Sequence, residues 1–141
     1  MSDNYKRNFL IGEIYLIDFE GSGSEQTGKR PGVIFQNNTG NFHSPNIIAL
    51  PLTSSLKKAS MPTHVLLRAN ETGLIKDSMV LCENPVCISK SKVGQYLTTL
   101  SPVYMEKIAI ASLIATSAIA FIKEEIFLAV KKTAVELNTV A

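Results

Sequence analysis

Residues 21–38 read GSGSEQTGKRPGVIFQNN, a polar, glycine-rich loop that runs directly into an apolar strand. Pro31 fixes the backbone just past Arg30 and restricts Arg30 itself to extended conformations. An arginine held in this way at the entrance of a strand presents a rigid fork of donors that suits a phosphate group. From composition alone, however, a solvated hairpin loop is the ordinary interpretation of such a stretch.

Short apolar segments separated by turn residues make up most of the chain before residue 101. Polar clusters at residues 37–41 and 70–73 are typical of turns. Residues 53–59 could form one helical turn. Short strands at this spacing predict a compact antiparallel barrel or sandwich. The predicted strands are residues 11–19, 32–36, 47–52, 64–67, 79–82 and 93–100.

The pattern changes after residue 100. Ser101 followed by Pro102 predicts the start of a helix, with a hydroxyl cap ahead of a proline in the first turn. Residues 108–122 are apolar nearly all round, which predicts burial against the sheet and against a second subunit. A single helix over residues 102–138 would be about 55 Å long, so we expect a break near residues 123–125. Beyond it, an apolar stripe predicts a second amphipathic segment, formed by Ile126, Val130, Ala134 and Leu137.

Composition limits the classes of protein to consider. A chain of 141 residues with 45% hydrophobic content is typical of one globular domain. A net charge of +2 excludes a histone-like polycation, so nucleic-acid binding would depend on a local patch. Cys82 and Cys87 have no further Cys or nearby His to complete a zinc set, and we expect reduced thiols and no metal site.

Two features bear on localisation. The N-terminal residues lack the apolar run of a secretory signal, which predicts a cytoplasmic protein. The apolar run at residues 108–122 is shorter than the roughly 20 residues that span a bilayer, so we expect a buried helix and no membrane association.

Six motifs occur in order along the chain at suitable distances, and together they are far more specific than any single loop. They are Gly12-Glu13-Ile14-Tyr15; Gly23-Ser24-Glu25-Gln26-x-Gly28-x-Arg30-Pro31 with Gln36-Asn37; Gly40-Asn41-x-x-Ser44-Pro45; Pro51-Leu52-Thr53-Ser54; Pro62-Thr63-His64-Val65; and Asp77-Ser78-x-Val80-Leu81-x-Glu83. Over residues 12–113 the chain thereby resembles the MazF/PemK toxin family, the mRNA endonucleases of bacterial toxin–antitoxin pairs.

The resemblance implies a fold and a set of partners. The expected fold is mainly β with a C-terminal helix, a compact antiparallel SH3-like barrel of the CcdB/PemK-like toxin type. We expect a toxin domain over residues 1–123 and a helical extension over residues 124–141. The implied partners are single-stranded RNA, a second copy in a homodimer, and a cognate antitoxin whose acidic, initially disordered segment folds on binding.

The resemblance also implies a chemistry. RNA can be cut by its own 2′-hydroxyl if the protein orients the backbone, stabilises charge on the phosphorane and moves two protons. This reaction needs neither a cofactor nor a protein nucleophile. The catalytic candidates are Arg30 for charge stabilisation, Thr53 as a phosphate donor, and Glu25 as a base or a carboxylate that orients Arg30. Each candidate has an ordinary alternative: a surface ion pair for Arg30, a backbone contact for Thr53 and a solvated loop position for Glu25. His64 is a weaker candidate for the base, and its alternative is a packing role.

RNA binding should fall to polar groups around these residues. Exposed base edges of single-stranded RNA are read by groups that both donate and accept hydrogen bonds, while lysines contact phosphates without specifying sequence. The candidates for base reading are Ser24, Gln26, Asn37, Ser54, Ser55 and Asn84, and those for phosphate contacts are Lys29, Lys57 and Lys58.

The chain departs from the family pattern in two regions expected to touch RNA. The loop that starts at Glu20-Gly21-Ser22 is about one residue shorter than usual, and Asn84-Pro85-Val86 replaces a more polar stretch after Glu83. The cleavage sequence therefore cannot be carried over from the family. Two alternatives stay open: a toxin of the same fold that poisons DNA gyrase, and a non-catalytic interaction module.

Overall fold

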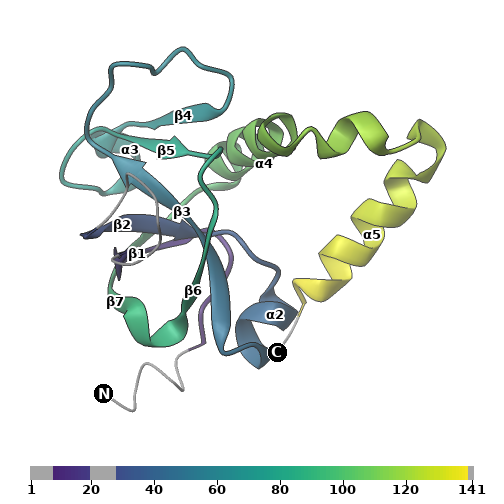
Figure 1. Cartoon of the computed structure of the whole chain (residues 1–141), viewed down its shortest axis with the longest axis horizontal. Helices are drawn as coiled ribbons and strands as arrows, with labels where there is room; N and C mark the ends of the chain where they lie inside the picture. The colour runs from purple at the N-terminus through teal and green to yellow at the C-terminus, as the bar shows by residue number, and fades with distance from the viewer. Residues whose placement is uncertain (1–7, 20–27, 140–141) are drawn as a thin grey trace.

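The computed structural model describes residues 8–19 and 28–139. Its centre is one antiparallel sheet of seven strands in the order β4-β5-β3-β2-β1-β7, with β6 pairing to β3 (Figure 1). The strands are β1 (Glu13–Asp18), β2 (Lys29–Ile34), β3 (Asn46–Thr53), β4 (His64–Leu67), β5 (Ser78–Leu81), β6 (Val86–Ser89) and β7 (Val93–Thr99). The predicted fold, mainly antiparallel β with a C-terminal helix, is confirmed.

The sheet curls so that its two ends approach each other. The Thr98 hydroxyl on β7 donates a hydrogen bond of 2.7 Å to the carbonyl of Thr72, which lies between β4 and β5 in the chain. In the described part of the chain no backbone pairing joins β4 to β7, so the sheet resembles a barrel that is open along one seam.

Two apolar clusters result from this curl. One lies between the sheet and the C-terminal helix and contains Leu52, Leu67 and Ile108. The other contains Phe19 and Ile17, which lie so close to β2 that a Cβ at Gly32 would approach their side chains to 2.8 and 2.9 Å. Glycine at position 32 is therefore what allows these side chains to lie against β2.

Four short elements before α4 were not predicted, and they are β6, α2, α3 and the 3₁₀ helix η1 (Lys90–Lys92). β6 follows Pro85 and does not alternate between apolar and polar residues, so the sequence shows no strand pattern there. The polar clusters predicted as turns contain α2 (Asn38–His43) and α3 (Ala69–Thr72). The side chain of Asn37 caps α2, and Gly73 ends α3 in the left-handed conformation. The helical turn suggested for residues 53–59 is absent from the structure.

The C-terminal helix α4 (Pro102–Thr116) begins where the sequence predicts and packs against β4. It ends six residues short of residue 122, because Ser117 takes the left-handed conformation at φ 58°. The Thr116 hydroxyl donates to the Ser112 carbonyl and accepts from the Ala118 amide, so it competes with the helical backbone pattern at this point.

Beyond Ser117 the chain turns back in two steps. Two 3₁₀ segments, η2 (Ala118–Phe121) and η3 (Glu124–Ile126), are separated by extended backbone at Lys123, in the region of the predicted break. The helix α5 (Phe127–Leu137) then runs back to α2, as Figure 1 shows. In the described part of the chain, no helix combines the length and apolar character needed to cross a bilayer.

Candidate functional site

A pocket of about 520 Å³ opens where β2 begins and β3 ends. In the pairing of these strands Gly32 lies opposite Pro51 and Val33 opposite Leu50. Arg30 and Thr53 lie two residues beyond the last pair, at the ends of the two neighbouring strands. Both side chains line the pocket, so strand pairing brings two of the predicted catalytic residues together.

Thr53 is half-buried at the end of β3, and its hydroxyl accepts a hydrogen bond of 3.1 Å from the Ser55 amide. This contact uses a lone pair of the oxygen and leaves its O–H proton to donate elsewhere. Ser54 and Ser55 are exposed and line the same pocket. The end of β3 therefore presents three hydroxyl groups to this space.

Arg30 is half-buried in β2, and pairing with Ile17 of β1 fixes its backbone. Its neighbour Pro31 also lines the pocket, while Lys29 is exposed opposite Asp18 at the start of the strand. A guanidinium in this position carries a permanent positive charge beside the Thr53 hydroxyl.

The second wall of the pocket comes from the connection between α3 and β5, which the sequence did not predict as part of the site. It contributes the exposed Lys76 and Ile75, the latter 95% exposed, together with Gly73 and Leu74. Ser78 of β5 and Leu97 of β7 complete the lining. The Asp77-Ser78 motif pointed to this segment, but nothing in it indicated that Lys76 lines the same pocket as Arg30.

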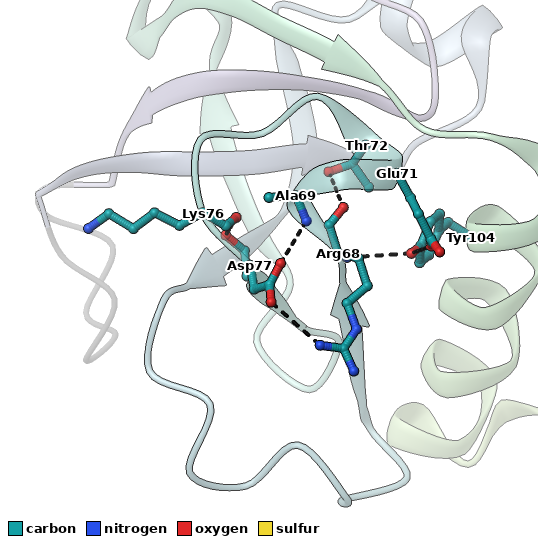
Figure 2. Close-up of polar contacts among 8 residues, drawn as sticks. Arg68, Ala69, Glu71, Thr72, Lys76, Asp77 and Tyr104 are labelled. Carbon is teal, nitrogen blue, oxygen red and sulfur yellow. Dashed lines mark hydrogen bonds and ion pairs between the residues drawn. The ribbon is translucent and has the colours of Figure 1, made fainter.

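A hydrogen-bond network holds this wall in place (Figure 2). The Asp77 carboxylate accepts from the Ala69 amide at 2.7 Å and from the Arg68 guanidinium at 3.5 Å. The Tyr104 hydroxyl of α4 donates to Glu71 and accepts from the Arg68 amide at 3.4 Å. The hydrogen bond to Glu71, followed by burial, raises the pKa of Tyr104.

Lys76 takes no part in this network. Figure 2 shows its side chain extending away from the Asp77 cluster, while its backbone carbonyl accepts from the Ser78 hydroxyl. The network thus connects the wall to α4 and leaves the Lys76 ammonium group available to a ligand.

The other predicted residues lie at varying distances from the pocket. Glu25, Ser24 and Gln26 lie outside the described residues. Asn37 lies beyond the opposite end of β2, where its side chain accepts from the Gly40 amide at 2.9 Å. Lys57 and Lys58 are exposed in the connection from β3 to β4, just beyond Ser55, and the half-buried Asn84 lies in the turn between β5 and β6. The structure therefore brings together Arg30, Thr53, Ser54 and Ser55, but not Asn37, Lys57 or Asn84.

His64 has a packing position, with its side chain 5% exposed. Its Nδ1 lies 2.8 Å from the Lys58 carbonyl and its Nε2 lies 2.7 Å from the Glu83 carboxylate. A carbonyl only accepts, so Nδ1 is the donor, and the second contact requires a proton between Nε2 and Glu83. The ring thereby joins the β3–β4 connection to the β5–β6 turn and has no nitrogen left for a reaction.

Other reactive side chains are dispersed. Cys82 is a buried free thiol and Cys87 an exposed one. In residues 8–19 and 28–139, no three His, Cys, Asp or Glu side chains are grouped closely enough to bind a metal ion.

Similarity to known proteins identifies the family of this chain. The sequence model of a family described as "PemK-like, MazF-like toxin of type II toxin-antitoxin system" matches residues 11–114. The chain belongs to this PemK/MazF family. The predicted family is therefore confirmed, and the match ends just before α4 does.

Individual relatives agree with the assignment to the PemK/MazF family. Over 98 residues the chain is 41% identical to the endoribonuclease MazF of Staphylococcus saprophyticus, a match that covers 69% of this chain and 82% of the relative. A mycobacterial endoribonuclease structure shares 25% identity at a TM-score of 0.66, covering 80% of this chain and 95% of the neighbour. Another mycobacterial endoribonuclease structure, in complex with its cognate antitoxin, shares 27% identity at a TM-score of 0.64. The match covers 77% of this chain and 95% of the neighbour. All three are named as endoribonucleases, and none of them supports the gyrase-binding alternative.

Proposed function

We propose that this chain is an endoribonuclease toxin that cuts single-stranded RNA at a short sequence motif by attack of the RNA's own 2′-hydroxyl. The observation that carries the proposal is the meeting of Arg30 and Thr53 in one pocket. These two side chains provide a permanent cation and a hydroxyl donor on neighbouring strands, in a chain whose named relatives are endoribonucleases.

The proposed reaction forms a bond between the 2′-oxygen and the adjacent phosphorus and breaks the bond from phosphorus to the 5′-oxygen. A base takes the 2′-hydroxyl proton, and an acid returns one to the departing 5′-oxygen. Charge that develops on the non-bridging phosphate oxygens is stabilised by the Arg30 guanidinium and by the Thr53 O–H. The protein supplies no nucleophile of its own.

We propose Glu25 as the base or as the carboxylate that orients Arg30. A guanidinium titrates above a pH of about 12, so proton abstraction suits a carboxylate better than Arg30. Glu25 lies in the connection that leads into β2, five residues before Arg30.

The surroundings of the pocket support a path for RNA. We propose that Ser54 and Ser55 read base edges next to the cut and that Lys76 contacts a phosphate on the opposite wall. The remaining predicted contacts would bind nucleotides before or after the cut, and they are Ser24, Gln26, Lys29, Asn37, Lys57 and Asn84.

We propose that the toxin acts in the cytoplasm as a homodimer and is neutralised by a cognate antitoxin. One solved relative is in complex with its antitoxin. An acidic antitoxin segment laid along Lys29, Arg30 and Lys76 would occupy the cations that we assign to the RNA backbone.

The test is incubation of the purified protein with long single-stranded RNA in EDTA, followed by mapping of the product ends. We expect 2′,3′-cyclic phosphates and 5′-hydroxyls. Deoxyribose at the single position 5′ of the cut should abolish cleavage while binding persists. Products with 5′-phosphates would refute the mechanism, and absence of cleavage across varied sequences would favour a non-catalytic interaction module.

A further inference from the structure

The helix α5 lies against almost nothing in its own chain. Each of its eleven residues is exposed, although its sequence is amphipathic. Isolated helices shorter than about 12–15 residues are marginal in water, and most helices in proteins are stabilised by packing of an apolar face. Its end is tethered to α2, where the Thr39 hydroxyl donates to the Leu137 carbonyl and Asn38 donates two hydrogen bonds to Asn138. The apolar face of α5 therefore requires a cover from outside the chain.

The helix α4 has a second apolar face as well. Its inner face buries Ile108 and Ala111 against the sheet. On the opposite side, Ile110, Leu113 and Ile114 are 54, 38 and 45% exposed, and their spacing of three and four residues places them on one stripe. This outer stripe and the apolar face of α5 lie in consecutive parts of the chain.

Exposed apolar side chains are concentrated in this part of the molecule. Of the nineteen large hydrophobic residues exposed in the described chain, twelve lie between Val103 and Leu137. The largest apolar patch of a typical monomer covers about 300–600 Å², and twelve such side chains exceed what a monomer usually leaves in water. The surface is also electrically neutral, because residues 102–139 carry four basic and four acidic residues.

We infer that residues 117–139, here named the arm, pack against a second copy of this chain. The inference extends the proposed dimer to a segment beyond the family match and does not depend on RNA cleavage. In a two-fold dimer the arm of one copy lies on the outer α4 stripe of the other, and the same contact is made twice. Each copy thus covers the apolar face that the other exposes.

Two observations favour a second copy over an antitoxin as the occupant. An acidic antitoxin segment would find no excess of positive charge on a neutral surface. The mycobacterial toxin solved with its antitoxin is matched over 95% of its own length, and the match covers 77% of this chain. The family match also ends at residue 114, before the arm begins.

The inference can be tested with full-length variants and sedimentation equilibrium. The double substitution Phe127→Glu with Val130→Glu places two carboxylates on the apolar side of α5, where the two residues lie three positions apart and are already exposed at 38 and 47%. We expect the dissociation constant of the dimer to rise about tenfold or more, because two apolar side chains that association would remove from water are replaced by carboxylates. The control, Lys132→Glu, changes the net charge by the same amount on the polar side and should leave that constant unchanged.

Cross-linking locates the contact directly. A photoreactive residue at position 130, in a mixture of isotopically light and heavy copies, should give mixed light–heavy products that map to residues 103–114. Circular dichroism verifies that every variant keeps its secondary structure. Products confined to one chain, or an unchanged dissociation constant for the double variant, would overturn the inference and leave an antitoxin as the remaining occupant of the arm. A full-length monomer at all concentrations would overturn the proposed dimer as well.

Discussion

At the scale of single residues, the Thr53 hydroxyl makes the local backbone contact that the sequence analysis gives as the alternative to ligand binding. A threonine at a strand end can use its side chain to bond local backbone or to bind a ligand. Here it accepts from the Ser55 amide, so the local contact and a donated hydrogen bond to a phosphate are compatible. The local contact also limits rotation of the side chain, which aids a group that must meet a transition state.

We predict that Arg30→Ala and Thr53→Ala each reduce the rate of RNA cleavage by about 10²–10³, because each removes a donor to the phosphorane. The rate is measured on a short RNA that contains the mapped cut site. Lys123→Ala removes an exposed cation outside the pocket and should leave the rate unchanged. Near-normal cleavage by Arg30→Ala would refute its assignment.

Lys76→Ala should weaken RNA binding similarly for all sequences, because a lysine contacts phosphate without reading bases. The slope of the logarithm of the binding constant against the logarithm of salt concentration should fall by about 0.7, the value for one phosphate contact in single-stranded nucleic acid. Fluorescence anisotropy with a cleavage-resistant deoxy-substituted RNA measures this slope. An unchanged slope would show that Lys76 does not contact the backbone.

The buried thiol gives a prediction about pH. Burial raises the pKa of Cys82 from 9.0 to about 11. The unfolded chain therefore loses this proton at a lower pH than the folded chain does. The free energy of unfolding should fall as the pH rises from about 9 to about 11, and the fall should be smaller in Cys82→Ala. The free energy of unfolding is measured by denaturant titration of both proteins at several pH values. The difference between the two proteins gives the contribution of Cys82, because the lysines and tyrosines that titrate in the same range are common to both.

At the scale of elements, the wall formed by the α3–β5 connection depends on α4. Tyr104 contacts both Glu71 and the Arg68 amide, and Asp77 holds the start of α3, so a helix outside the pocket positions one side of it. Residues that never touch RNA can therefore affect how Lys76 is presented.

Tyr104→Phe should lower the free energy of unfolding by about 1–3 kcal/mol, because two partly buried hydrogen bonds are lost, one of them to a carboxylate. It should also raise the KM for RNA more than it lowers kcat, since Arg30 and Thr53 lie on other elements. Thermal unfolding and steady-state kinetics test the two effects. A loss confined to kcat would contradict a positioning role through the wall.

At the scale of the whole molecule, the chain consists of a curled sheet that carries the pocket and an arm that lies outside the family match. No side chain of α5 is buried, so the arm adds little to the core. The division into a domain over residues 1–123 and an extension over residues 124–141 remains a proposal.

We predict that a chain ending at Lys123 folds to the same sheet and cleaves RNA at high protein concentration. The loss consists mainly of exposed hydrogen bonds between α2 and the segment 137–138, each worth about 1 kcal/mol or less. Circular dichroism, thermal unfolding and the cleavage assay are the measurements. A truncated chain that is unfolded would show that the extension belongs to the domain.

Much of the fold can be read from local patterns. Five of the predicted strands coincide closely with observed ones, and α4 begins at Pro102 because proline suits the first helical turn. The predicted hydroxyl cap is wrong, since the Ser101 side chain makes no capping hydrogen bond. β6 escaped prediction because its strand character comes from pairing with β3 rather than from its own alternation of apolar and polar residues. The end of α4 at Ser117 depends on side-chain contacts of Thr116 that apolar content does not reveal.

The sequence by itself determined the strand pattern, the start of α4 and the family, because each of these depends on residues close together or on motifs in chain order. The tertiary structure alone decided that Arg30 and Thr53, on neighbouring strands, line one pocket together with Lys76. It alone showed that the rest of the chain leaves the side chains of α5 exposed. The physical reason is that pairing and packing join residues far apart in sequence, and a local pattern records only that a face is apolar, not which surface covers it.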